Sequence, residues 1–406
     1  MLRRIPTTEL RLGMFITELC GSWIDHPFWK KRFLLQDERD LRRLLDSGVA
    51  EVVIDTARGL DTAVANAEAT GPAPAAPTAE PAMAVPLRVA LDEEVSRAYR
   101  ICARSRDAVV SMFNDVRMGQ AIDAEKVVEL VEEITESVLR NPDALISLAR
   151  LKRADEYTYM HSVAVCALMI GLARQLGLSE QDVQEAGIAG LLHDVGKMAI
   201  PDAVLNKPGK LTDGEFAVVR NHPEAGVRLL RDSPRVSEIA LDVCLHHHEK
   251  VDGTGYPHRL RGDQISLFAR MGAVCDVYDA VTSNRPYKAG WDPAEAVRRM
   301  AEWSGSHFDE AVFQAFVKTV GIYPTGSLVR LESGRIGVVV EQHPHSLLKP
   351  RVKVFFSSKS REPIPQRVLD LAAPGVTERI VARESAQAWG FRHVDELWSG
   401  LPSAYA

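Results

Sequence analysis

The sequence predicts a mainly α-helical protein, with a small α/β unit near its N-terminus and a short β-rich segment near its C-terminus. Two observations predict the helical part. Apolar residues recur at helical spacing over almost all of residues 157–316, and Ser179, Thr212 and Asp292 begin helix-capping patterns. Short β-rich runs bounded by turn residues flank this part on both sides. We therefore expect one large all-helical domain between two smaller units.

The region before the helical part is expected to contain a small domain and a linker. Residues 1–61 hold two β-rich runs, Thr17–Leu19 and Val52–Ile54, with helical spacing between them from Asp37 to Leu45. This pattern predicts a small α/β domain. Residues 62–87 are rich in alanine and proline, which bury too little apolar surface to offset the entropy of ordering. They predict a flexible linker.

Four further regions follow the linker. Helical spacing resumes over residues 88–144, which predicts a helical connector, and continues through the large domain at residues 145–320. After that point apolar runs alternate with glycine and proline turns, which indicates a short β-meander over residues 321–375. We expect a loose helix and a tail over residues 376–406.

The composition excludes several classes of protein. The 406 residues are 46% hydrophobic and 26% charged, which is typical of a folded globular chain. A net charge of −6 offers no overall basic surface for a nucleic-acid duplex, and no apolar run is long enough to span a membrane. Five scattered cysteines without a CxxC pair predict reduced thiols and a cytoplasmic protein.

Histidine and aspartate residues are concentrated in the predicted helical domain, where seven of the twelve histidines lie between His161 and His258. Imidazole and carboxylate ligands without thiolates suit a pair of borderline or hard divalent ions better than a structural zinc ion. Asp194 is the carboxylate expected to bridge the two ions, and Glu249 is expected to orient the imidazoles. The candidate ligands are His161, His193, Asp194, His222, His247, His248 and Asp276.

Such a set of ligands would support hydrolysis of a phosphodiester. Two ions about 3.5–4 Å apart lower the pKa of a shared water and bind both oxygens of the bond that is cut. Taken alone, His161 is better explained as a hydrogen-bonded core residue, and Asp276 is equally explained as a capping or ion-paired acid. A structural explanation of the whole set would require several unrelated buried polar residues, each costly without a partner. The set therefore favours a metal site.

Two motifs in this region resemble those of HD-GYP domains, a branch of the HD phosphohydrolases that hydrolyses the bacterial second messenger cyclic di-GMP. They are HDVGK at residues 193–197 and HHEKVDGTGYP at residues 247–257. The flanking sequence agrees, since RPYK stands at residues 285–288. The resemblance covers about residues 145–320 and implies an all-helical, metal-dependent cyclic di-GMP phosphodiesterase.

The resemblance also implies roles for individual residues. The seven candidate ligands match positions that hold two divalent ions, for which iron or manganese is expected, with Asp194 as the bridge. Lys197 matches a position that contacts substrate phosphate and assists proton transfer. Asp194 and Lys197 are therefore expected to be catalytic. Arg285 and Lys288 match phosphate-binding positions. Tyr256 matches the tyrosine at the substrate pocket, with a purely structural turn residue as an equal alternative.

The chain also departs from some members of the family. Tyr157 stands where three-metal members carry a glutamate, and a phenol with a pKa near 10 is a poor ligand at neutral pH. We therefore expect two ions and mainly the linear product pGpG, with GMP formed slowly. His246 receives no ligand role, because the paired histidines of the family directly precede the glutamate. Residues 1–61 resemble a small domain of undefined function that often precedes HD-GYP units.

Three functions compete at this point. The first is a phosphodiesterase with cyclic di-GMP as its substrate. The second is a catalytically weak sensor or docking module of the same fold, which missing ligands would favour. The third is an HD phosphohydrolase for other nucleotides, against which the GYP motif with Arg285 and Lys288 argues. A homodimer or a regulatory protein partner is also conceivable, with Leu91–Leu139 as the contact, although packing within the chain explains that stretch equally well.

Overall fold

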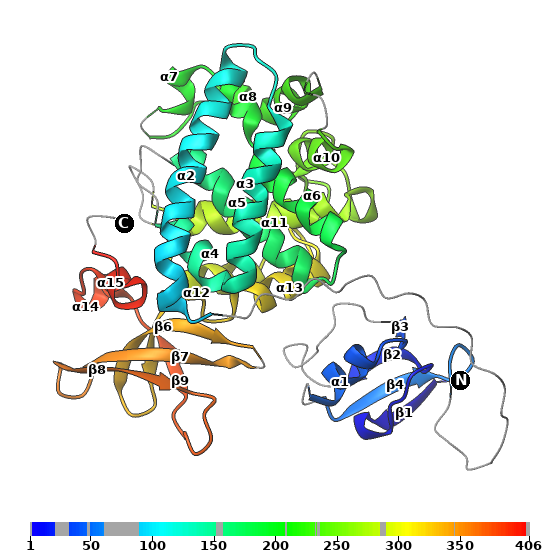
Figure 1. Cartoon of the computed structure of the whole chain (residues 1–406), viewed down its shortest axis with the longest axis vertical. Coiled ribbons are helices and arrows are strands. Elements are labelled where there is room, and N and C mark those ends of the chain that lie inside the picture. The colour runs from blue at the N-terminus through cyan, green and yellow to red at the C-terminus, as the bar shows by residue number, and fades with distance from the viewer. Residues whose placement is uncertain are drawn as a thin grey trace. The chain divides into compact units, whose positions relative to one another are not determined.

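The chain folds as two units, residues 1–87 and residues 88–406 (Figure 1). The computed structural model describes residues 2–20, 32–46, 49–60, 89–151, 157–207, 209–231, 233, 236–284, 290–344 and 346–402. The alanine- and proline-rich linker predicted over residues 62–87 lies outside the described residues.

The N-terminal unit is a four-stranded antiparallel sheet with one helix, which confirms the predicted α/β class and adds β1 and β3 to the two predicted β-rich runs. The strands follow the order β1-β4-β2-β3. Side chains alternate between the two faces of a strand, so Ile16 and Ile54 point into the core beside Leu44 of the helix, and all three are buried. The elements are β1 (Leu2–Pro6), β2 (Phe15–Cys20), β3 (Phe33–Leu34), α1 (Glu38–Asp46) and β4 (Glu51–Asp55).

The second unit begins with a bundle of helices arranged around α5, against which α4, α6, α11 and α13 pack (Figure 1). A helix that is apolar on all sides is stable only when it is surrounded, and Val163, Leu168 and Leu172 of α5 are all buried. The helices are α2 (Leu91–Arg117), α3 (Ala124–Arg140), α4 (Pro142–Arg150), α5 (Tyr157–Gln175), α6 (Glu180–Leu192), α7 (Asp202–Leu205), α8 (Asp213–Val219), α9 (His222–Arg231), α10 (Glu238–His246), α11 (Leu267–Thr282), α12 (Pro293–Ala301) and α13 (Glu310–Val320).

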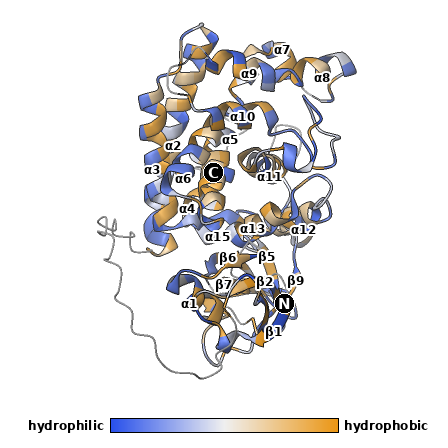
Figure 2. Ribbon diagram, turned by 90° about the vertical axis from the view of Figure 1, so that its right-hand side faces the viewer, coloured by the Kyte–Doolittle hydropathy of each residue, from blue (hydrophilic) through white to orange (hydrophobic). Residues whose placement is uncertain are grey.

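Helices α2 and α3 cover one side of this bundle. Their hydrophilic residues line the outer faces, and their hydrophobic residues face the other helices (Figure 2). A fully buried carboxylate joins the two helices: Glu94 of α2 accepts hydrogen bonds from Ser137 at 2.8 Å and from Nε of Arg140 at 2.8 Å. Because every charge buried here has a partner, the contact holds α2 on α3 without leaving an unpaired ion.

The helix starts predicted from the sequence are confirmed. The Ser179 hydroxyl accepts a hydrogen bond from the Asp182 N–H at 3.1 Å, and Thr212 and Glu215 form both bonds of a capping box. Asp292 caps α12, with Pro293 in the first helical position. These side chains satisfy N–H groups that have no partner within the helix.

The second unit ends in a five-stranded antiparallel sheet with the order β8-β7-β6-β5-β9. The β-meander predicted for residues 321–375 corresponds to four of its strands. The fifth, β9, was not predicted, because four residues are too few to show an alternating pattern. The elements are β5 (Leu328–Leu331), β6 (Arg335–His343), β7 (Ser346–Ser357), β8 (Glu362–Asp370), β9 (Ile380–Arg383), α14 (Ala386–Trp389) and α15 (Val394–Ser399). Among the described helices, none has the length and apolarity needed to cross a membrane.

Candidate metal centre

Seven side chains from five separate segments of the helical unit meet at one place, and we call them the His/Asp cluster. They are the seven candidate ligands of the sequence analysis. All are buried except His248, whose side chain is 24% exposed. His161 lies in α5 and Asp276 in α11, whereas His193 and Asp194 directly follow α6, His222 begins α9, and His247 and His248 directly follow α10.

Asp194 lies between two pairs of imidazoles. Its Oδ1 is 3.3 Å from Nε2 of His222 and 3.8 Å from Nε2 of His247. Its Oδ2 is 3.4 Å from Nε2 of His161 and 3.4 Å from Nε2 of His193. The two oxygens of one carboxylate therefore face different sets of nitrogen atoms.

The other ring nitrogen of these four histidines is held by an oxygen acceptor. A carbonyl or carboxylate oxygen can only accept, so Nδ1 carries the proton. In a neutral ring, Nε2 is then left with a lone pair directed toward Asp194. The Nδ1 contacts are His161 to Asp279 Oδ2 at 2.6 Å, His193 to Gly190 O at 2.8 Å, His222 to Val219 O at 2.8 Å and His247 to Val243 O at 3.0 Å.

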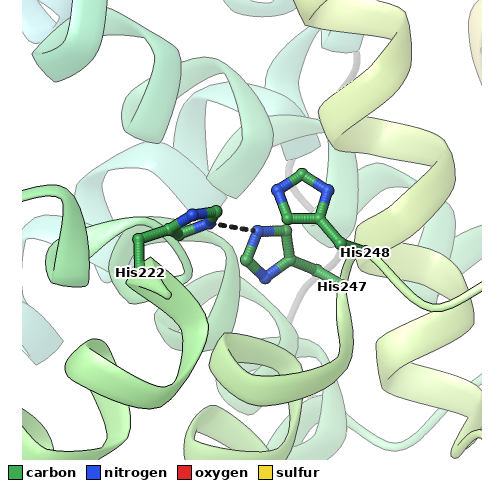
Figure 3. Close-up of side chains that lie close together, drawn as sticks. All are labelled: His222, His247 and His248. Atoms are coloured by element: carbon green, nitrogen blue, oxygen red, sulfur yellow. Dashed lines mark hydrogen bonds between the residues drawn. The ribbon is translucent and has the colours of Figure 1, made fainter. Parts of the chain in front are cut away.

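The nitrogen and oxygen atoms that converge here can together bind a cation. The Nε2 atoms of His222 and His247 lie 3.3 Å apart (Figure 3), although both rings already donate through Nδ1. Nε2 of His193 and Oδ1 of Asp194 are buried and have no hydrogen-bond partner among the described residues. Buried lone pairs that face one another are unfavourable without a positive charge between them, so the arrangement fits bound divalent ions.

The donor atoms fall into two groups, one on each side of Asp194. Within each group the donor atoms lie within 4.8 Å of one another. A third overlapping group, made of His193, Asp194 and His247, connects the two. The first group is His161, His193 and Asp276, and the second is His222, His247 and His248.

The electrostatic environment keeps most of these groups in the form that binds a metal. Burial lowers the pKa of His248 to about 3, and burial with the neighbouring imidazoles also lowers the pKa of His247, so both rings are neutral. Burial alone would raise the pKa of Asp194, but Lys197 and the neighbouring imidazoles hold it well below its usual value. The pKa of His161 rises to about 10 despite burial, because three carboxylates surround its ring.

Lys197 lies on the 3₁₀ turn Val195–Ala199, and its Nζ donates to Oδ2 of Asp194. The turn depends on the glycine of the HDVGK motif. A Cβ on Gly196 would lie only 1.9 Å from the carbonyl oxygen of His222, so no larger residue fits there. Gly196 thus lets the backbone that carries Lys197 pack directly on the start of α9.

The GYP part of the second motif lies against the cluster. The Tyr256 ring stacks on His248 with 4.7 Å between the ring centroids and 29° between the planes. A Cβ on Gly255 would lie 2.5 Å from Cα of Glu249, so this glycine allows the loop to fold back on the residues that follow α10. Tyr256 therefore contacts a candidate ligand directly.

The role predicted for Glu249 is wrong. Its carboxylate accepts hydrogen bonds from the backbone N–H of His258 at 2.6 Å and of Leu260 at 3.1 Å, and it holds the loop rather than an imidazole. Asp279, which the sequence analysis missed, is the carboxylate that orients His161. The spacing could have identified it, because Asp279 stands one helical turn after Asp276 and shares its face of α11.

Some predicted residues are not part of the described cluster. Arg285 and Lys288, and the side chain of Tyr157, lie outside the described residues. His246, for which no ligand role was predicted, contacts Asp242 at 2.7 Å through Nδ1 and His258 at 3.0 Å through Nε2.

Family models and known relatives match the chain. The family model described as an HD domain matches residues 137–312, and a domain of unknown function, DUF3391, matches residues 2–127. A cyclic di-GMP phosphodiesterase of Pseudomonas aeruginosa is 64% identical over 99% of this chain and 96% of its own length.

Two more distant relatives match shorter parts of the chain. The cyclic di-GMP phosphodiesterase response regulator RpfG of Xanthomonas campestris is 42% identical over 42% of this chain and 47% of its own. A 3'3'-cGAMP-specific phosphodiesterase of Vibrio cholerae is 40% identical over 36% of this chain and 28% of its own. With near-complete alignment to one relative, and with both predicted motifs at the His/Asp cluster, the chain belongs to the HD-GYP family of metal-dependent phosphodiesterases.

Proposed function

We propose that this chain hydrolyses cyclic di-GMP to linear pGpG with a pair of divalent ions, iron or manganese. The observation that carries the proposal is the position of Asp194, which offers one oxygen to each of two groups of ligands. Two relatives, from Pseudomonas aeruginosa and Xanthomonas campestris, are cyclic di-GMP phosphodiesterases, which supports the substrate.

The seven residues of the His/Asp cluster would hold the ions. When bound, such ions supply an activated water and neutralise charge on the phosphodiester. Asp194 would be shared, because its two oxygens face opposite sides. His161, His193 and Asp276 would complete one site, and His222, His247 and His248 would complete the other.

Four residues are assigned to the substrate. Lys197 lies beside Asp194, and its ammonium would bind a phosphate oxygen and move a proton at the reacting centre. Arg285 and Lys288 are assigned to phosphate by the family motif, since cyclic di-GMP carries two negative charges and charged donors bind phosphate strongly. Tyr256 is assigned to the pocket wall, because its ring packs on His248.

Two alternatives deserve a direct test. A sensor of the same fold would bind the messenger without cleaving it, but such a role gives no reason for the complete set of converging ligands. The other alternative is that 3'3'-cGAMP is the substrate, because one relative is specific for that dinucleotide. Both molecules carry the same pair of phosphodiesters and differ only in one base.

The test uses the full chain, purified without oxygen and loaded with Fe²⁺ or Mn²⁺. Cyclic di-GMP and 3'3'-cGAMP are supplied in parallel, and the products are separated by chromatography over time. We expect pGpG as the main early product, and Asp194→Ala as the inactive control. Tight binding of cyclic di-GMP without turnover by a metal-loaded chain would favour the sensor, and faster turnover of 3'3'-cGAMP would change the substrate.

A further inference from the structure

Four side chains form a row that leads from the His/Asp cluster toward solvent. Tyr256 stacks on His248, and Cζ of Arg220 lies 4.6 Å from the centroid of the same Tyr256 ring. Phe216, one turn earlier in the chain, has its ring centroid 6.0 Å from Cζ of Arg220 and is 50% exposed. Arg220 thus stands one aromatic ring away from a candidate metal ligand.

Within the part of the chain that the structure describes, the guanidinium of Arg220 is not committed to a carboxylate. Among the residues that the structure describes, it has no ion pair, whereas Lys197 is paired with Asp194 and Lys207 with Glu215. A guanidinium stacked on an aromatic ring uses its face and leaves the N–H donors on its edge free. Arg220 therefore combines a fixed plane with N–H donors that no described carboxylate uses, beside the cluster.

We propose that Arg220 binds the phosphate of cyclic di-GMP that is not being cleaved. The inference rests on the proposed function and deepens it. While one phosphate of the ring lies at the His/Asp cluster, the other still carries a negative charge a short distance away. The planar fork of a guanidinium matches two phosphate oxygens at once. Arg220 would thereby favour cyclic dinucleotides over simple phosphodiesters that have only one phosphate.

Tyr256 fixes the position of the Arg220 guanidinium relative to the His/Asp cluster. Its ring contacts His248 on one side and supports Arg220, so it links the position of the guanidinium to the position of the cluster. Tyr256 would then be the platform on which Arg220 is oriented.

The experiment compares two substrates in Arg220→Ala, Arg220→Lys and the wild-type chain, all loaded with Mn²⁺. Cyclic di-GMP carries two phosphates, and bis(p-nitrophenyl) phosphate carries one. Arg228→Ala, an exposed arginine of α9, is the matched control. We expect Arg220→Ala to lower kcat/KM for cyclic di-GMP about ten- to a hundredfold more than for the aryl ester, mainly through KM. The loss in Arg220→Lys should lie between those of the wild type and Arg220→Ala, because lysine keeps the positive charge but lacks the planar pair of N–H donors of the guanidinium.

An equal loss on both substrates would contradict the proposal, since it would mean that Arg220 acts on the cluster through Tyr256. No loss on either substrate would contradict it as well. A wild-type chain that cleaves only the aryl ester would instead contradict the proposed function. In that case, the Kd of cyclic di-GMP is measured for the wild type and for Arg220→Ala. The proposed role of Arg220 requires that the variant bind cyclic di-GMP more weakly by about one to two decades.

Discussion

Nδ1 of His161 lies 2.6 Å from Oδ2 of Asp279, and Nε2 of the same ring lies 3.0 Å from Oδ1 of Asp276. Two carboxylates one turn apart on α11 therefore hold one imidazole by its opposite nitrogens. Asp279 determines which nitrogen carries the proton, and Asp276 lies with the candidate ligands. The ring is thus oriented before any ion arrives.

Asp279→Asn should weaken metal binding without unfolding the protein. An amide keeps the size of the side chain but removes the charge that orients His161, and losses of this kind cost about ten- to a hundredfold in metal affinity. Titration of the metal-free chain with Mn²⁺ measures the effect, with the exposed Asp107→Asn as control. An unchanged affinity would show that His161 needs no charged partner at Nδ1.

Glu249→Gln should disturb substrate binding while leaving the metal in place. The glutamine keeps one acceptor oxygen but directs an amide donor at one of the two backbone N–H groups, which costs about 1–3 kcal/mol for the buried group. The loop that carries Tyr256 then loosens, and we expect KM for cyclic di-GMP to rise while the metal content stays constant.

The exposed Glu224→Gln is the matched control for this loop variant, and bound metal is measured in the same samples. If Glu249→Gln lost metal with an unchanged KM, Glu249 would act on the imidazoles after all.

Arg285→Ala should weaken substrate binding without removing metal. The sequence motif assigns this residue to phosphate, and loss of one charged hydrogen bond costs about one to two decades in affinity. Binding of cyclic di-GMP and metal content are measured on the same preparation. Unchanged affinity would mean that the side chain points away from the substrate.

Removal of residues 1–86 should leave an active, metal-loaded fragment. The candidate ligands all lie in the second unit, which begins at residue 88 and has its own core. The alanine- and proline-rich stretch offers little apolar surface for a contact. The measurement compares turnover per bound metal ion in the fragment with that in the full chain. Aggregation or metal loss in the fragment would show that the N-terminal unit supports the catalytic part.

Sequence reasoning succeeds where local patterns determine structure. The caps at Ser179, Thr212 and Asp292 depend on residues within three positions, and the structure contains all three. The HDVGK and GYP motifs carry the glycines that close backbone approach requires, at Gly196 and Gly255. These features can be read from neighbours in the chain.

Inference from the sequence fails where the role of a residue depends on partners far away in the chain. Glu249 stands beside His248 in sequence, yet its carboxylate folds away to bind the loop at His258. Asp279 orients a ring 118 residues earlier, and its spacing from Asp276 marks it as a candidate without showing which imidazole it holds. Arg220 carries no motif, and only the folded chain places it on Tyr256.

The metal content of the chain tests the central claim most directly, namely that Asp194 is shared between two ions. Homogeneous protein purified without oxygen is analysed for metal by mass spectrometry, beside Asp194→Ala prepared in the same way. The account predicts close to two ions per chain in the wild type and loss of both in the variant, which keeps its helical circular dichroism. Three ions in the wild type, or two ions retained in Asp194→Ala, would contradict it.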